Sequence, residues 1–489
     1  MPAELHALLL RPATELARLV RAGEISATEL ATAALERIAA VDPQIGAFTD
    51  IDEHGALQAA ATITAGDDRP LAGVPIAVKN NRAVLGLPVR SGGRITEALL
   101  ASYDHHTTAR LRDAGAVIVG TTALPEWGLL PTTEPLHRPP TRNPWQPART
   151  AGGSSGGAAA AVAGGMVPLA HGNDGGGSLR IPAACTGLVG LKPQRGRVSQ
   201  GPETGENYLV VDGALTRTVA DTALALDVLA GPQLGDATWA PPHHESYGVA
   251  LTRDLGPLRI AVMTDTGLPG VRPGAPQLRA LHETAQLLER LGHEIIEPEL
   301  ALPVDGRALA DVMLDLLTDM ASTQPRVLGA AGKAMAGGAG PVQQEDLDPL
   351  GWAVMQRAAA RSATDAWQTK FLADGLARIV VGTFAQYDVV LSPALVCDPV
   401  PIGEIHAGHD DPLAVFSLVE RFIAYSPLAN ITGLPAISLP THLIDGLPVA
   451  VQATARACEE SLLLRLAAQL EAEHGWQHRL SPVASAAAR

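Results

Sequence analysis

The stretch Arg149–Pro193, RTAGGSSGGAAAAVAGGMVPLAHGNDGGGSLRIPAACTGLVGLKP, contains two glycine clusters, GGSSGG and GNDGGGS. Glycine loses more backbone entropy on folding than any other residue, so clustered glycines indicate a special turn or a close approach of the main chain to another group. The run AAAAVAGGMVPLA between the clusters is typical of a helix start followed by buried structure. The sequence therefore predicts that the two clusters belong to one structured site.

Several alternatives would use such glycines. A flexible linker seldom continues directly into buried structure, and a phosphate-binding loop would need a lysine after the glycines, which neither cluster has. Gly152–Gly156 does satisfy the GxSxG nucleophile elbow of α/β-hydrolase esterases, with Ser154 as the nucleophile. The prolines of the preceding HRPPTRNPWQPARTA disfavour the strand that an elbow needs, so the esterase remains an alternative.

Acyl transfer would use both clusters together. It needs a nucleophile, a base and main-chain N–H donors around the developing oxyanion. In DGGGSL, the N–H groups of Gly175, Gly176 and Gly177 immediately precede the hydroxyl of Ser178. This order places oxyanion donors beside a candidate nucleophile.

The choice of base depends on the lysines. Of 36 basic residues only four are lysines, so the chain uses arginine almost wherever a positive charge stands. Lysine, unlike arginine, loses its proton when it is buried, and can then act as a base. Lys79 ends the apolar run Leu71–Val78, which predicts a buried strand, and is therefore the candidate base.

Composition limits the class of partner. The chain has 489 residues, a net charge of −15 and no basic block, which disfavours a nucleic-acid or anionic-membrane surface and favours a small-molecule partner. Cys185, Cys397 and Cys458 are far apart in sequence, which suggests neither a disulfide framework nor a metal knuckle. With no signal-peptide pattern and no membrane-length apolar run, we expect a cytoplasmic protein without metal or cofactor.

Apolar periodicity alternates between helix and strand along the chain, which predicts an α/β fold. Two helices are expected within 13–40, separated at AGEIS, where Ser26 and Glu29 have capping-box spacing. Residues 231–248 are the best linker candidate. The small-residue segment 328–340 predicts a surface loop, with a lid over a pocket as the functional alternative.

The motifs GVPIAVKN, TRNPWQPARTAGGSSGG, GNDGGGSLRIPAACTGLVGLKP, NITGLPAISLP and GLPVAVQ together resemble the amidase signature family. The similarity runs over nearly the whole chain. It implies one α/β/α domain, 1–489, with a mixed central β-sheet covered by helices on both faces. A catalytic core at about 65–225 would be followed by a variable substrate-side region at about 235–380 and a closing segment at about 385–475.

The resemblance also implies a Ser–cisSer–Lys triad. Ser178 would be the nucleophile, Ser154 the bridging serine after a cis peptide, and Lys79 the proton acceptor, in a variant of triad logic. The oxyanion hole would use the three N–H groups of 175–177. The remaining expected site residues are Ser155, Asp174 and Arg180 as supports, and Trp127 in a segment similar to a pocket wall. Asn173 and Gly175 depart from the more usual GTDTGGS.

The expected function is hydrolysis of a small aliphatic, aryl, cyclic or oligomeric amide, with esterase or carbamate side activity. AHGND, TTEP and TRNPW are most similar to the 6-aminohexanoate cyclic-dimer hydrolase type. The amidotransferase subunit of a transamidosome is an alternative, which Ile181 disfavours because that group usually has Gln there. A catalytically silent binding protein is the least favoured alternative. Besides its small-molecule substrate, a second copy of the chain, in a homodimer, is the partner considered. His105–His106 and His243–His244 lack metal-ligand spacing, so surface histidines are expected, and His171 is expected to be a packed, hydrogen-bonded residue.

Overall fold

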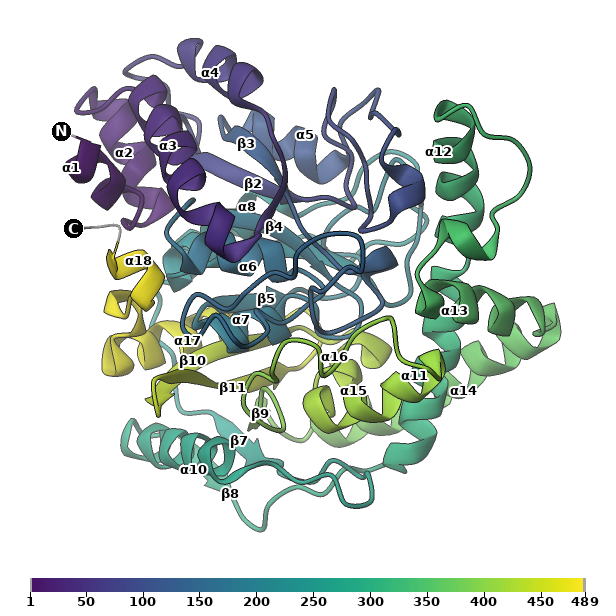
Figure 1. Cartoon of the computed structure of the whole chain (residues 1–489). Helices are drawn as coiled ribbons and strands as arrows, with labels where there is room; N and C mark the ends of the chain where they lie inside the picture. Colours follow the sequence, from purple (N-terminus) through teal and green to yellow (C-terminus); the bar gives the residue numbers. More distant parts are fainter. Residues whose placement is uncertain (1, 487–489) are drawn as a thin grey trace.

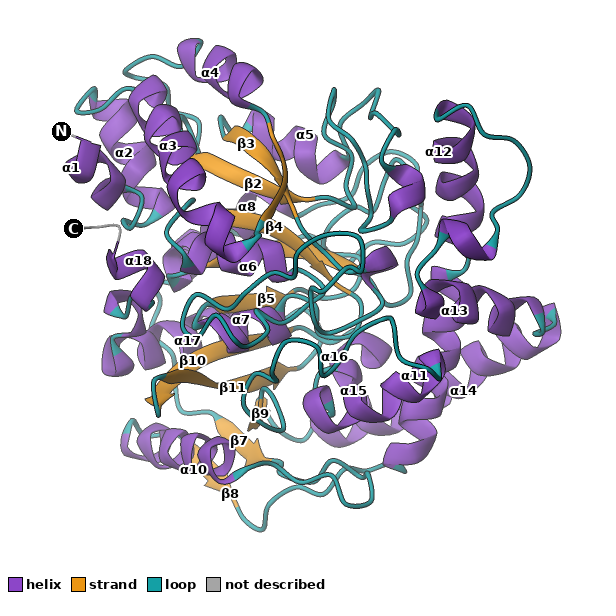
Figure 2. Cartoon of the chain, viewed as in Figure 1, coloured by secondary structure: helices purple, strands orange, loops and turns teal. Residues whose placement is uncertain are grey.

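The computed structural model describes residues 2–486, which form one mixed sheet with helices around it (Figures 1 and 2). The eleven strands lie in the order β1-β3-β2-β4-β6-β5-β10-β11-β9-β7-β8. Their bounds are β1 Phe48–Ile51, β2 Pro75–Lys79, β3 Val117–Thr122, β4 Leu169–Asp174, β5 Val189–Lys192, β6 Val211–Thr216, β7 Arg259–Val262, β8 Glu294–Ile296, β9 Val389–Pro393, β10 Ala436–Ile444 and β11 Leu447–Ala455.

Two parallel groups of strands are joined by antiparallel ones. β2 is parallel to β3 and β4, and β7 is parallel to β8 and β9. The central strands β4, β6, β5, β10, β11 and β9 pair antiparallel in turn. The α/β fold with a mixed central sheet is therefore confirmed.

Helices cover both faces of the sheet (Figure 2). The helices are α1 Pro2–Leu8, α2 Ala13–Ala22, α3 Ala27–Ile45, α4 Glu53–Ala61, α5 His106–Asp113, α6 Gly156–Ala163, α7 Arg180–Thr186, α8 Val219–Leu229, α9 Tyr247–Ala250, α10 Ala275–Arg290, α11 Gly306–Ala321, α12 Ala330–Met335, α13 Pro349–Ala359, α14 Ala363–Phe384, α15 Val415–Ile423, α16 Pro427–Thr432, α17 Glu460–His474 and α18 Pro482–Ala486. α6 packs on α7, whereas α8 packs on α5 and α17. The chain passes from β2 through α5 to β3 and returns through α6 to β4, so right-handed crossovers place α5 and α6 on opposite faces.

Local sequence signals account for the first helices. Ser26 caps α3 by accepting a hydrogen bond from the Glu29 N–H, and the Glu29 carboxylate accepts one from the Ser26 N–H in return. Gly23, with φ of 70°, ends α2 in the left-handed conformation that glycine adopts most readily. The predicted pair of helices and its capping box are confirmed.

Three other features bear on the sequence predictions. The predicted loop at 328–340 is wrong in part, because α12 occupies Ala330–Met335, where Ala, Lys and Met favour a helix. The candidate linker 231–248 lacks regular structure before α9 begins at Tyr247, yet strands from both sides of it join the same sheet. The division into core, variable and closing regions stays a prediction. No helix within residues 2–486 has the length and apolar character to cross a membrane.

Candidate active site

The parallel strands β2, β3 and β4 bring the candidate residues to one edge of the sheet. Lys79 is the last residue of β2, the segment with Trp127 follows β3, and the segment with Ser178 follows β4. Because parallel strands point the same way, their carboxyl ends meet at the same edge, which is where α/β folds place ligands. The fold therefore assembles the site from three separate segments.

Lys79 is completely buried at the end of a strand whose five residues are all buried. Its Nζ donates hydrogen bonds to Ser154 Oγ and to Asn173 Oδ1, each at 2.7 Å. Burial, and then the charge of Arg82, lowers the pKa of Lys79 to about 7, although Asp212 and Asp174 act in the opposite direction. A large fraction of Lys79 is therefore neutral near pH 7 and can accept a proton.

Ser154 lies in a tight turn before α6. The Gly153–Ser154 peptide is cis, and a Cβ at Gly153 would lie 2.7 Å from the main chain of Thr132, so only glycine fits there. This turn faces the nucleophile segment, because Ser155 N donates to the Ser178 carbonyl at 3.3 Å. Ser155 Oγ also donates to the Asn173 carbonyl at 3.1 Å. The two glycine clusters thus meet through hydrogen bonds.

The DGGGS segment leaves Ser178, the candidate nucleophile, partly exposed. Ser178, Gly175 and Gly176 are partly exposed, whereas Gly177 is buried with φ of 123°. The N–H of Gly177 donates to Asp174 Oδ1 at 2.7 Å, which differs from the predicted role of Gly177 as an oxyanion donor. The N–H groups of Gly175, Gly176 and Ser178 donate to no atom of the described residues.

Asp174 and Arg180 form a completely buried ion pair, with Nε to Oδ2 and Nη2 to Oδ1 both at 3.0 Å. Burial alone would raise the pKa of Asp174, but the Arg180 guanidinium and Asn430 hold it well below its ordinary value. Arg180 also donates to Asn430 Oδ1 and Gln452 Oε1, each at 2.7 Å, and to the Ser426 carbonyl at 2.8 Å. The pair therefore ties the nucleophile segment to α16 and β11.

Sequence reasoning missed a contact of Asn173. The departure from GTDTGGS marked this position, but only the fold shows that its side chain accepts from Lys79. Asn173 Nδ2 in turn donates to Asn81 Oδ1 at 2.9 Å, which fixes the amide with its oxygen toward Lys79. Asn81 follows β2 in the motif GVPIAVKNN, so both amides lie next to triad segments in the sequence.

A cluster of three side chains, Arg82, Asp212 and His171, lies next to Lys79. Asp212 accepts from Arg82 Nε at 2.9 Å, and His171 Nε2 lies 3.0 Å from Asp212 Oδ1. Burial lowers the pKa of His171, whose hydrogen bond to Asp212 opposes the shift. His171 is therefore a packed, hydrogen-bonded residue, as predicted. The prediction of surface histidines at His105–His106 is wrong at His105, whose side chain is completely buried.

Trp127 lies in a buried turn, Glu126–Gly128, beside the triad. Its N–H donates to the Ser91 carbonyl at 2.8 Å, and a Cβ at the next residue, Gly128, would lie 3.2 Å from Ser154 Oγ. The glycine therefore leaves room for the bridging serine. The predicted contact of Trp127 with a substrate stays a prediction.

Two apolar side chains that the sequence did not indicate flank the exposed glycines. A Cβ at Gly175 would lie 3.0 Å from Val210 Cγ2, and one at Gly176 would lie 2.9 Å from Met313 Cε. Val210 precedes β6 and Met313 lies on α11, more than a hundred residues after the nucleophile. The surroundings of the exposed main chain are therefore apolar.

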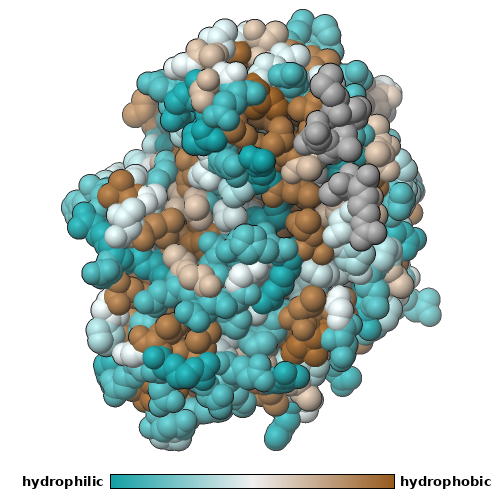
Figure 3. Space-filling view, turned by 90° about the vertical axis from the view of Figure 1, so that its left-hand side faces the viewer, coloured by the Kyte–Doolittle hydropathy of each residue, from teal (hydrophilic) through white to brown (hydrophobic). Residues whose placement is uncertain are grey.

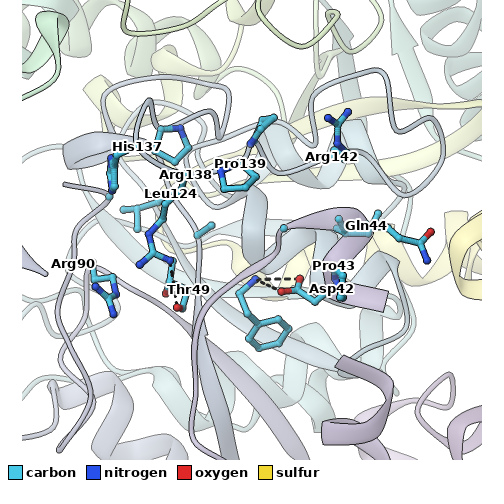
Figure 4. A pocket seen from close by; sticks show the side chains of 17 residues that line it. Asp42, Pro43, Gln44, Thr49, Arg90, Leu124, His137, Arg138, Pro139 and Arg142 are labelled. Atoms are coloured by element: carbon cyan, nitrogen blue, oxygen red, sulfur yellow. Dashed lines mark hydrogen bonds between the residues drawn. The ribbon is translucent and has the colours of Figure 1, made fainter. Parts of the chain in front are cut away.

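A separate cavity of about 250 Å³ lies beside β1, and Figure 4 shows its lining. The side chains around it include Arg90, Arg138 and Arg142, together with Leu124 of the segment that follows β3. None of the triad residues lines it. It is distinct from the site around Ser178. Within residues 2–486 no group of three or more His, Cys, Asp or Glu side chains is placed to hold a metal ion.

Comparisons with known proteins show the family of the chain. The amidase family model matches residues 29–464. The 6-aminohexanoate-cyclic-dimer hydrolase of Pseudomonas sp. (strain NK87) is 34% identical over 492 residues, covering 96% of each chain. A glutamyl-tRNA(Gln) amidotransferase subunit of Acidothermus cellulolyticus is 35% identical over 490 residues, covering 96% of this chain and 95% of that one.

A solved structure of 6-aminohexanoate cyclic dimer hydrolase complexed with substrate superimposes with a TM-score of 0.89 at 31% identity, covering 97% of this chain and 99% of that one. The family match, over residues 29–464, spans most of the chain, and the fold match covers 97% of it. The chain belongs to the amidase family and is an amide-hydrolysing enzyme.

Proposed function

We propose that this enzyme hydrolyses a small organic amide through an acyl-enzyme on Ser178, with Ser154 and Lys79 as the proton relay. The observation that carries the proposal is the 2.7 Å hydrogen bond between buried Lys79 and Ser154, in a turn that also bonds the main chain of Ser178. A base with a pKa of about 7 suits proton transfer at neutral pH.

In the first half-reaction, Ser178 Oγ attacks the amide carbonyl carbon. Its proton passes to Ser154 Oγ while the Ser154 proton passes to Lys79 Nζ. The tetrahedral intermediate then collapses, the C–N bond breaks, and the leaving nitrogen takes a proton back through Ser154. In the second half-reaction, water adds to the ester carbonyl and gives its proton to the same relay, which releases the acid and restores Ser178.

The oxyanion donors that fit best are the N–H groups of Gly175 and Gly176, together with that of Ser178. They have no partner within the described chain, and their residues are partly exposed. Gly177 shapes the loop instead, because Asp174 accepts its N–H. Preformed donors stabilise the developing negative charge without reorganisation at the moment of reaction.

Asn173 is a positioning residue for the base. Its amide oxygen accepts a hydrogen bond from Lys79 Nζ, which orients the other N–H bonds and the lone pair of that nitrogen. Asn81 holds the Asn173 amide in this orientation. The lone pair of neutral Lys79 is then available to Ser154. The cluster of Arg82, Asp212 and His171 adds a fixed electrostatic environment behind the amine.

The surroundings of the glycines favour an apolar acyl group. Val210 and Met313 lie next to Gly175 and Gly176, so an aliphatic or aryl chain would find apolar contacts there. This agrees with linear, aryl or cyclic amides as the substrate class. Esters or carbamates, which have better leaving groups, are alternative substrates.

Amidotransferase activity is the second candidate, since such a protein is among the relatives. Ile181 disfavours it. The Ile181 side chain is buried and its Cδ1 would lie 2.5 Å from a Cβ at Gly177, so it packs under the nucleophile loop and offers no polar group to a side-chain amide. A hydrolase that acts alone is therefore preferred.

Labelling with a small fluorophosphonate tests the proposal. We expect one adduct by intact mass, located on Ser178 by peptide mapping and absent from Ser178→Ala. A panel of aliphatic, aryl and cyclic amides then defines the substrate. An adduct on Ser154 that persists in Ser178→Ala would instead support the nucleophile-elbow esterase. Labelling at Ser178 without hydrolysis of any free amide would support the amidotransferase.

The pH dependence of kcat/KM follows from the base. Lys79 acts only when neutral, so kcat/KM is expected to rise with pH and to level off above an apparent pKa of about 7. Initial rates on a non-ionising amide, taken from acid to alkaline pH, measure this rise of kcat/KM. A rate independent of pH across that range would contradict Lys79 as the base.

A further inference from the structure

The outward face of α14 carries four uncovered apolar side chains, with the exposed Gln368 and Arg378 among them. Trp367 and Phe371 are 75% and 79% exposed, and Leu372 and Ile379 are 55% and 52% exposed. In Figure 1, α14 lies at the edge of the molecule, beyond α11 and α13. Two adjacent aromatic side chains in water on one helix indicate an interaction site, since the largest apolar patch on a protein surface is often functional.

The opposite face of α14 holds the helix firmly in place. Thr369, Ala373, Val380 and Phe384 are buried, and α14 packs on α11 and α16. The apolar outward face is therefore a fixed feature of the fold and does not come from a detached helix. By contrast, the face in Figure 3 carries hydrophobic residues in separate groups among hydrophilic ones.

Two glycines lie on the same outward face. A Cβ at Gly375 or Gly382 would have no atom of the described residues within 4 Å. Glycine weakens the interior of a helix, and nothing else in the described chain needs the space that these two leave. Small residues on a helix surface let another helix approach closely. The glycines therefore point to a helical partner.

The order of large and small residues is self-complementary. If two copies of α14 cross antiparallel with Gly375 on the twofold axis, residue n faces residue 750 − n of the other copy. Phe371 then meets the partner's Ile379, and Trp367 falls beside the partner's Gly382. Trp367, Phe371 and Ile379 thus meet apolar or vacant positions, as an isologous interface requires, whereas Leu372 faces the partner's Arg378.

We propose that the enzyme forms a twofold dimer through α14, with Gly375 at the crossing point. The four exposed side chains present roughly 500 Å² per copy, so the pair would cover about 1,000 Å², the lower limit for a specific interface. Only Arg378 is charged among the exposed residues of α14, and the chain has a net charge of −15, which disfavours an anionic membrane as the occupant.

Sedimentation velocity over a range of protein concentrations tests the dimer. We expect the wild type to dimerise and Phe371→Glu to raise the dissociation constant by roughly 30-fold or more, as for loss of an interface hot spot. Trp239→Glu is the matched control, because Trp239 is 59% exposed but lies outside α14. A dimer that Phe371→Glu leaves unchanged, or a monomer at every concentration, would overturn the proposal.

Substitutions at two glycines distinguish a specific twofold helix pair from nonspecific hydrophobic association. Gly375→Leu adds apolar surface but fills the crossing point, so it is expected to weaken the dimer. Gly375→Cys is expected to oxidise to a covalent dimer, whereas Gly382→Cys is not, since position 382 faces position 368. If Gly375→Leu strengthens association, or if the wild type floats with phosphatidylcholine vesicles through Phe371, then α14 has a different occupant and the proposal fails.

Discussion

Replacing Ser178 by alanine is expected to lower kcat for an amide substrate by roughly 10⁵-fold or more, as loss of the nucleophile does in other serine enzymes. The hydroxyl is the only group that forms the acyl-enzyme in the proposed reaction. Its neighbours are held by the main chain and by Asp174, so the loop keeps its shape without the hydroxyl. Single-turnover rates on a small amide or ester measure the loss.

The controls for Ser178→Ala are thermal unfolding and the binding of a non-hydrolysable amide. Both are expected to match the wild type, because the side chain is partly exposed and small. Turnover within tenfold of the wild type would place the nucleophile elsewhere, and Ser154 would be the next candidate.

Replacing Lys79 by arginine is expected to lower kcat by about 10²- to 10⁴-fold, the range for a lost general base. The charge is conserved, but a guanidinium does not give up its proton at any ordinary pH, so the relay from Ser154 has no acceptor. The larger head group must also fit a completely buried position beside Asn173. Initial rates are measured from acid to alkaline pH, because the rise of activity with pH that is expected of the wild type is not expected of the variant.

Lys333→Arg is the matched control for the base. Lys333 lies on α12 and pairs with Asp346 at 2.8 Å, a contact that arginine can also make. Activity there is expected to equal that of the wild type. If Lys79→Arg also keeps its activity, Lys79 has a structural role only.

Much of the fold was predictable from local pattern. The strand ending at Lys79 and the helices 13–22 and 27–45 have apolar runs, caps or glycine stops within a few residues of their bounds. The candidate site residues were identified from motifs that each lie within a short stretch, and their catalytic roles stay predictions.

What the sequence did not indicate depends on contacts between distant segments. Met313 and Asn430 reach the nucleophile loop from α11 and α16, and no spacing rule links them to residues 174–178. The burial of His105 and the exposure of Phe371 likewise depend on which elements pack over them. The pairing of the Gly177 N–H with Asp174 could not be read from a run of three glycines.

The buried ion pair of Asp174 and Arg180 depends on residues that are made late in the synthesis of the chain. Both residues leave the ribosome early, but Asn430 and Gln452, which accept from Arg180, are made near the end of the chain. β5 likewise waits for β10 to complete its pairing. Until then the guanidinium lacks partners that its burial requires. A growing chain therefore carries the candidate residues Ser154, Ser178 and Lys79 long before the late partners of Arg180 exist, and the segment after β4 has its full set of contacts only once the last strands have joined the sheet.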